Sequence, residues 1–134
     1  MITLSKAKKA LEMSEAKAKE LGIAVTTAIV DEHGTVIATS KMDGALIISP
    51  EFAYTKAYTS AILMSPTSGL AAYAEEGKPY SGLRDIFGGE LTTIAGGVPV
   101  KQDEKVVGGV GVGGSMNPTE DEMCAMEAAK LLES

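Results

Sequence analysis

Glycines recur at every second position of a stretch near the C-terminus, and this spacing is the strongest sign of binding chemistry in the sequence. Val106 to Gly114 reads as a strand in which Gly109, Gly111 and Gly113 share one face and valines share the other. A glycine inside a strand costs about 0.5–1 kcal/mol relative to alanine, so three on one face indicate that another group approaches the backbone closely. The first candidate is the small-residue face of a helix or a second subunit, and the second candidate is a flat ligand that lies on the sheet; the two are not exclusive. The sequence leaves these alternatives open.

Lys56 is the charged residue in the most unusual setting, because its predicted helix face otherwise carries small residues such as Ala53, Ala57 and Ser60. A partly buried lysine needs a carboxylate partner or a shifted pKa. Asp43, in the Asp-Gly turn that precedes this helix, is the partner that we predict. Such a pair serves either as a structural ion pair or in acid/base catalysis, so Lys56 and Asp43 are the candidate catalytic residues.

Metal-ligating and nucleophilic side chains are scarce. The chain has one cysteine, Cys124, and one histidine, His33. These counts exclude an intramolecular disulfide framework, a cysteine-rich metal site and a centre built on several histidines. We expect Cys124 to be a small core residue and His33 to be a solvated side chain in a turn. We therefore predict no metal site.

The net charge and the lengths of the apolar runs indicate which kinds of partner the protein binds. The 134 residues include 18 acidic and 12 basic side chains, for a net charge of −6. A protein that binds duplex nucleic acid gains affinity by neutralising phosphates with Lys and Arg, so we expect no nucleic-acid partner. No apolar run approaches the roughly 20 residues that span a bilayer, so we expect no membrane partner. No targeting segment is visible, and we expect a single cytoplasmic domain over residues 1–134.

The helices and strands that position these residues are predicted from the spacing of apolar residues and from helix-capping residues. Apolar residues at 3-to-4 spacing from Leu4 to Leu21 predict a helix, with Thr3 as its N-cap and Gly22 at its end. Asn117 and Glu120 form a capping box that opens the last helix. The order helix, hairpin, helices, hairpin, helix predicts an α+β fold in which helices cover an antiparallel sheet. The predicted strands are residues 23–31, 35–40, 92–95, 98–100 and 106–114.

Several motifs, in order along nearly the whole chain, resemble the GlcG/HbpS family, also called the haem-degrading domain family. Each motif alone is weak, but their order and spacing together are specific. The resemblance implies a profilin-like, three-layer α/β/α domain. Its five-stranded antiparallel sheet has the order 2-1-5-4-3, with helices on both faces and the glycine strand in the middle. The motifs are Val30-Asp31-x-x-Gly34, Lys41-Met42-Asp43-Gly44-Ala45, Lys56-Ala57-Tyr58-Thr59-Ser60-Ala61, Pro66-Thr67, Gly96-Gly97-Val98-Pro99-Val100, the Gly-Val strand from Val107 to Gly114, and Asp121-Glu122.

The resemblance also bears on cofactors. Some members bind haem, including a secreted sensor-system protein and the C-terminal domain of a corrinoid adenosyltransferase. In the secreted member, a histidine just ahead of the first helix ligates iron, whereas Met1 and Ile2 occupy that stretch here. A second ligating position, a threonine, falls near Leu91, with Thr92 and Thr93 adjacent. The missing histidine disfavours haem, and the cofactor stays unknown.

The leading hypothesis is a small-molecule-binding, homo-oligomeric accessory domain of a catabolic or cofactor-related pathway, of the glycolate- or diol-utilisation type. The predicted pocket lies between the glycine face and the loops that carry Asp43-Gly44 and Gly96-Gly97-Val98-Pro99. The alternatives are a haem- or corrinoid-binding protein, an enzyme that uses Lys56 or Asp43 on a small oxygenated substrate, and a purely structural oligomer component. The predicted ligand-binding residues are Asp43, Gly44, Lys56, Thr59, Gly97, Pro99, Gly109, Gly111 and Gly113.

Overall fold

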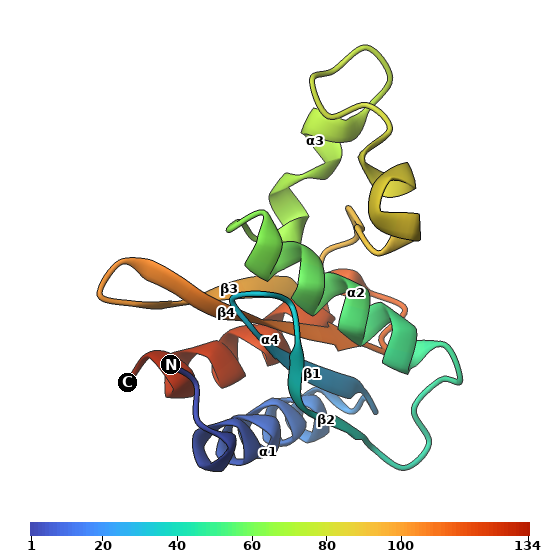
Figure 1. Cartoon of the computed structure of the whole chain (residues 1–134). Coiled ribbons are helices and arrows are strands. Elements are labelled where there is room, and N and C mark those ends of the chain that lie inside the picture. Colours follow the sequence, from blue (N-terminus) through green and yellow to red (C-terminus); the bar gives the residue numbers. More distant parts are fainter.

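Four antiparallel strands form the middle layer of the computed structural model, which describes residues 1–134 (Figure 1). The strands are β1 (Thr26–Asp31), β2 (Val36–Lys41), β3 (Gly97–Gln102) and β4 (Lys105–Gly113). Their order across the sheet is β2-β1-β4-β3, so β4, which carries the glycines, is a central strand. The mixed α+β class with an antiparallel sheet is confirmed.

The expected fifth strand does not form, and the prediction of a five-stranded sheet in the order 2-1-5-4-3 was wrong. Residues 92–95 belong to no strand. The backbone N–H of Thr92 instead donates a buried hydrogen bond of 2.9 Å to the Thr59 hydroxyl. A donor that is satisfied by a helix side chain is not available to a strand ladder. The profilin-like assignment stays a prediction.

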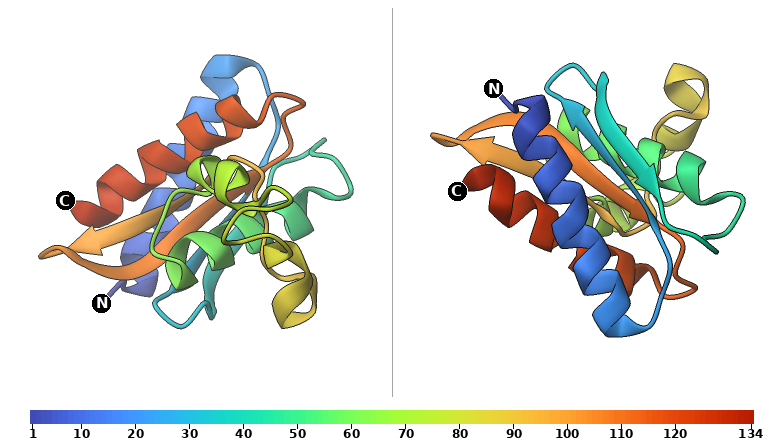
Figure 2. Two further views of the ribbon diagram at one scale, coloured as in Figure 1. Left: turned by 90° about the horizontal axis from the view of Figure 1, so that it is seen from above. Right: turned by 90° about the horizontal axis from the view of Figure 1, so that it is seen from below.

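Helices cover both faces of this sheet, as the two views of Figure 2 show. α2 (Ser49–Ile62) lies on one face, and α1 (Leu4–Leu21) and α4 (Pro118–Glu133) lie side by side on the other. The larger apolar cluster joins β1, β3 and β4 to α1 and α4. The smaller cluster consists almost entirely of alanines, so α2 packs very closely on the sheet. No helix has the length and apolar character needed to cross a membrane.

Local signals place the ends of α1 and α4. The Thr3 hydroxyl accepts a hydrogen bond from the N–H of Lys6, and Gly22 ends α1 in the left-handed conformation with φ of 73°. The Asn117 side chain caps α4 by accepting from the N–H of Thr119. The second half of the predicted capping box is not formed, because the Glu120 carboxylate accepts from the Ser115 hydroxyl instead.

Residues 63–91 form an arm that projects from the α2 side of the sheet (Figure 1). It contains two 3-10 segments, Thr67–Gly69 and Leu83–Gly89, and the short helix α3 (Ala71–Ala74). The buried side chains of the arm are those of Thr67, Leu70, Leu83 and Leu91. An arm with so few buried groups has no core of its own, so it depends on contacts with other parts of the protein.

Candidate functional site

The glycine face of β4 is covered by α2. A Cβ atom on Gly109 would lie 2.6 Å from the carbonyl oxygen of Ala57, and one on Gly111 would overlap the carbonyl of Ala53. The close neighbour is therefore the small-residue helix, the first of the two alternatives. Gly109, Gly111 and Gly113 were predicted to contact a ligand, and that prediction was wrong, because the helix backbone occupies the space.

Lys56 pairs with a different carboxylate from the one we predicted. Its Nζ lies 3.1 Å from Oδ2 of Asp121 and donates to the backbone carbonyl of Val112 over 2.8 Å. The side chains of Lys56 and Asp121 are each 2% exposed. Asp43 is exposed and lies beside Lys41 and Lys19 in a different depression. The structure therefore keeps the two candidate catalytic residues apart.

Two glycines allow Lys56 to reach across the end of the sheet. A Cβ on Gly96, where φ is 130°, would lie 2.8 Å from both Cδ and Nζ of Lys56. A Cβ on Gly97 would overlap the carbonyl of Lys56, and the N–H of Gly97 donates to the Thr67 hydroxyl. Gly97 therefore contributes close packing, and it lines none of the larger clefts described below.

Burial controls the titration of the Lys56–Asp121 pair. Burial lowers the pKa of Lys56 and raises the pKa of Asp121, and the attraction between the two charges offsets only part of each shift. The Phe52 ring adds a neighbour 5.7 Å from Nζ, measured to the ring centroid. A group 2% exposed does not exchange protons directly with a dissolved substrate, so the pair acts as a structural link between α2 and α4 in this conformation.

Asp121 also organises the loop that follows β4. Its Oδ1 accepts from the N–H of Ser115 over 3.0 Å. The Ser115 hydroxyl donates to Glu120 over 2.6 Å and accepts from the N–H of Asn117 over 2.9 Å. These bonds tie residues 114–117 to the first turn of α4. Sequence reasoning missed Asp121 as the partner, although its spacing from the buried residues Cys124, Ala125 and Ala128 marks the inner face of α4.

An open cleft of about 480 Å³ lies beyond the end of β4, and we call it the β4-end cleft. It is bounded by the turn between α1 and β1, the loop before α2 and residues 114–117. The first and last of these segments lie side by side in both views of Figure 2. Gly44 is the one predicted ligand-binding residue in this cleft. The lining residues are Ile23, Ala24, Gly44, Leu46, Gly114, Ser115, Met116, Asn117 and Glu120.

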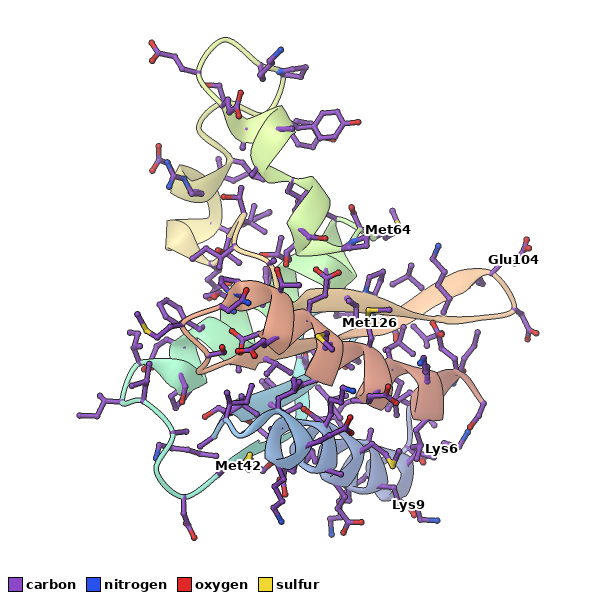
Figure 3. The ribbon with its side chains drawn as sticks, turned by 180° about the vertical axis from the view of Figure 1, so that it is seen from behind. Lys6, Lys9, Met42, Met64, Glu104 and Met126 are labelled. Atoms are coloured by element: carbon purple, nitrogen blue, oxygen red, sulfur yellow. The ribbon has the colours of Figure 1, made fainter.

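Two other predicted residues lie elsewhere. Thr59 is buried, where its hydroxyl accepts from Thr92 and donates to the carbonyl of Thr55. Pro99 lies on the edge strand β3 and lines a groove of about 460 Å³. Met64 and Met126 flank this groove, one on either side of β3 (Figure 3). The structure therefore does not bring the predicted ligand-binding residues together at one place.

The donor atoms present do not fit an iron–haem centre within one chain. Haem iron takes one or two axial side-chain ligands, commonly His, Cys, Met or Tyr. His33 lies in an exposed turn next to Glu32, and burial raises the pKa of the Cys124 thiol to about 12. The two positions that the resemblance implies for iron ligands lie on opposite faces of the sheet. Ile2 is buried in the cluster with α1 and α4, and Thr92 bonds to α2.

Comparison with known proteins gives consistent matches along the chain. A family model described as "Haem degrading protein HbpS-like" matches residues 2–130. An uncharacterised 15.0 kDa protein from the dhaT-dhaS intergenic region of Citrobacter freundii is 34% identical over 113 residues, which are 84% of this chain and 80% of that protein. The corrinoid adenosyltransferase PduO of Salmonella typhimurium is 34% identical over 106 residues. That match covers 78% of this chain but only 32% of PduO.

Solved structures share the fold over almost the entire chain. Protein ORFY of Klebsiella pneumoniae has a TM-score of 0.94 at 28% identity, and the match covers 99% of this chain and 91% of that one. A structure described as a PduOC:heme complex has a TM-score of 0.86 at 30% identity, with 96% of this chain and 90% of that chain covered. The second protein is therefore a haem-bound relative with the same arrangement of elements.

Proposed function

The chain belongs to the HbpS-like haem-degrading family, and from this membership we propose that it is a small-molecule-binding accessory protein that works as a homo-oligomer. The family resemblance read from the sequence is thereby confirmed. We further propose a catabolic or cofactor-related pathway of the glycolate- or diol-utilisation type, and a cytoplasmic location. The ligand site in this proposal is the β4-end cleft.

The observation that carries the proposal is the hydrogen-bonded support beneath this cleft. The Asp121 carboxylate accepts a hydrogen bond from the N–H of Ser115. The Lys56 ammonium group donates both to Asp121 and to the carbonyl of Val112. Every buried side-chain nitrogen and oxygen in the chain has a hydrogen-bond partner. A fully satisfied network of this kind keeps residues 114–117 in one conformation, and a fixed wall lowers the entropic cost of binding.

The lining of the cleft indicates the class of ligand. Ser115, Asn117 and Glu120 supply hydroxyl, amide and carboxylate groups, and Ile23 and Leu46 supply apolar surface. A carboxylate accepts hydrogen bonds from hydroxyl or ammonium groups and repels anions. The volume of about 480 Å³ is within the usual range for small-molecule sites. We therefore propose a short diol or related hydroxylated molecule rather than an acid.

A second copy of the chain is proposed to cover the outer rim of the cleft. Leu46 and Met116 line the cleft and are 45% and 90% exposed, and Ile47, which follows Leu46 in the chain, is 95% exposed. Large apolar side chains that are grouped and exposed indicate an interaction surface. Contact between copies at this rim would also shield a bound ligand from water.

Strand addition at β3 is not the proposed route to the oligomer. The N–H of Gly97 donates to Thr67, Pro99 has no N–H, and the N–H of Lys101 donates to the Glu133 carboxylate over 2.8 Å. None of these three positions therefore offers a free N–H to a neighbouring strand, which protects this edge from pairing with another chain.

A haem- or corrinoid-binding role is the second candidate. It is favoured by the haem-bound relative and by the similarity to a corrinoid adenosyltransferase. The absence of a histidine near the start of α1 and the inert Cys124 weigh against axial ligation by this chain. The enzyme alternative with Lys56 and Asp43 in acid/base roles is not proposed, because these residues are apart and Lys56 is buried.

A thermal-shift screen tests the proposal. Wild-type protein is heated with short diols, hydroxyacids, haem or a corrinoid, and the melting temperature is recorded. We expect a diol to raise the melting temperature of the wild type and of Glu122→Gln, but not of Glu120→Gln. Glu122 is the matched control, because it lies on the same turn of α4 but lines the groove of about 460 Å³ beside Pro99 of β3 instead of the β4-end cleft. Failure of every diol, or equal responses of the two variants, would contradict the proposed site.

A further inference from the structure

Arg84, the only arginine of the chain, lines a second cleft that is separate from the β4-end cleft. This cleft has a volume of about 300 Å³ and lies between α2 on one side and the last part of the arm with the segment that follows it on the other. Arg84 takes part in none of the ion pairs of the protein, although Asp85 is its neighbour in sequence. Its guanidinium group therefore has no carboxylate partner within the chain. The lining residues are Glu51, Phe52, Thr55, Arg84, Gly89, Leu91, Thr92 and Ile94.

The base of this cleft is fixed. The N–H of Thr92 donates to the buried Thr59 hydroxyl over 2.9 Å, which holds Leu91 and Thr92 against α2. Leu91 is 2% exposed, and Phe52 extends from the opposite wall. The cleft thus combines a rigid apolar base with one unpaired cation at its margin.

We propose that this cleft binds a small monocarboxylate, with Arg84 pairing to the carboxylate and Phe52, Leu91 and Ile94 packing on the apolar body. The planar guanidinium group matches a carboxylate through two parallel N–H···O bonds, a geometry that lysine does not provide. Glu51 also lines the cleft and would repel a second carboxylate on the ligand. The cleft should therefore prefer monocarboxylates over dicarboxylates of similar length.

This site goes beyond the proposed function, because the two clefts share no lining residue and favour ligands of opposite character. The β4-end cleft presents a carboxylate and no cation, whereas the second cleft presents the unpaired Arg84 guanidinium as well as the Glu51 carboxylate. A protein with both sites would recognise a neutral hydroxylated molecule and an acid independently. Failure of one site therefore leaves the other testable.

Titrations followed by amide NMR shifts test the inference with butyrate, its uncharged analogue butyramide and the dicarboxylate succinate, at constant ionic strength. We expect butyrate to shift the amides of Gly89, Leu91 and Thr92, and the other two compounds to bind at least about tenfold more weakly. In Arg84→Gln the Kd for butyrate should rise about tenfold or more, and in Arg84→Lys it should rise less. Glu51→Gln should improve the binding of succinate relative to butyrate.

Lys78→Gln is the matched control, because it removes one positive charge from an exposed position on the same arm, outside the cleft. We expect its Kd for butyrate to equal that of the wild type. The inference is overturned if wild-type protein does not bind butyrate, if butyramide binds equally well, or if Lys78→Gln weakens binding as much as Arg84→Gln. If Arg84→Gln does not fold, as judged by its amide spectrum, the comparison of Arg84→Lys with Lys78→Gln decides the question in the same way.

Discussion

Lys56 and Asp121 are 65 positions apart in the sequence, yet their side chains meet at 3.1 Å across the end of the sheet, where each is 2% exposed. Lys56 belongs to α2 on one face, and Asp121 belongs to α4 on the other. The pair therefore joins the two outer layers. It also supports the loop that forms one wall of the β4-end cleft, through the bond from the N–H of Ser115 to Asp121.

Replacing Lys56 by methionine should destabilise the protein strongly. The substitution leaves the Asp121 carboxylate buried without a counter-charge, and such changes typically cost about 3–5 kcal/mol. The free energy of unfolding, measured with urea, should fall by this amount. Lys17→Met is the control, since the Lys17–Glu20 pair is partly exposed and should contribute about 0–1 kcal/mol. Equal losses in the two variants would show that the buried pair has no special structural role.

The stability of the protein should depend on pH through this same pair. Burial lowers the pKa of Lys56 below its usual 10.5, so in the window between the lowered value and 10.5 the unfolded chain holds a proton that the folded chain has lost. The free energy of unfolding should therefore rise with pH across that window. The comparison is the double variant Lys56→Met/Asp121→Leu, in which the other groups titrate as before. The free energy of unfolding of the wild type minus that of the double variant should increase as the pH rises towards 10.5. A value that stays constant or decreases with pH would contradict this prediction.

Adding a methyl group to the glycine strand should disrupt packing. Gly111→Ala places a Cβ against the carbonyl of Ala53, in a contact between backbones that has little freedom to relax. Overpacking of this kind costs about 1–3 kcal/mol, and the melting temperature should fall accordingly. Gly69→Ala serves as the control, because a Cβ there meets no atom within 4 Å. If Gly111→Ala is as stable as Gly69→Ala, α2 does not press on β4 as the structure shows.

The proposed contact between copies should depend on the apolar rim of the β4-end cleft. Ile47→Asp introduces a charge at a side chain that is 95% exposed in the single chain, so it should leave the fold intact and reduce the molar mass measured by light scattering. Leu4→Asp, at a 52% exposed position on α1, should leave the assembly unchanged. An unaltered oligomer in Ile47→Asp would place the contact elsewhere.

Local rules predicted α1, the start of α4 and the place of the glycine strand correctly. Thr3, Gly22 and Asn117 act as the expected helix signals, because capping depends on the few residues nearest to each helix end. The central position of β4 and the α+β class were also predicted. These features depend on short-range sequence or on motifs that the family shares.

Long-range pairing was not predictable in the same way. Asp43 is nearer to Lys56 in sequence than Asp121 is, but the fold brings the first turn of α4 to Lys56 across the end of the sheet and leaves Asp43 in an exposed turn. The glycine spacing correctly indicated a close neighbour, and it held no information on whether that neighbour was a helix or a ligand. The segment 92–95 has the composition of a strand, but the N–H of Thr92 donates to the Thr59 hydroxyl and the N–H of Ile94 donates to the Thr92 hydroxyl.

Mapping of a bound diol by amide NMR shifts tests the central claim most directly. With butane-2,3-diol, the largest shifts should fall on Gly44, Ser115, Met116 and Asn117, and they should disappear in Glu120→Gln while persisting in Glu122→Gln. Shifts confined to other surfaces, or no shifts with a well-folded wild-type protein, would contradict the assignment of the β4-end cleft as the ligand site.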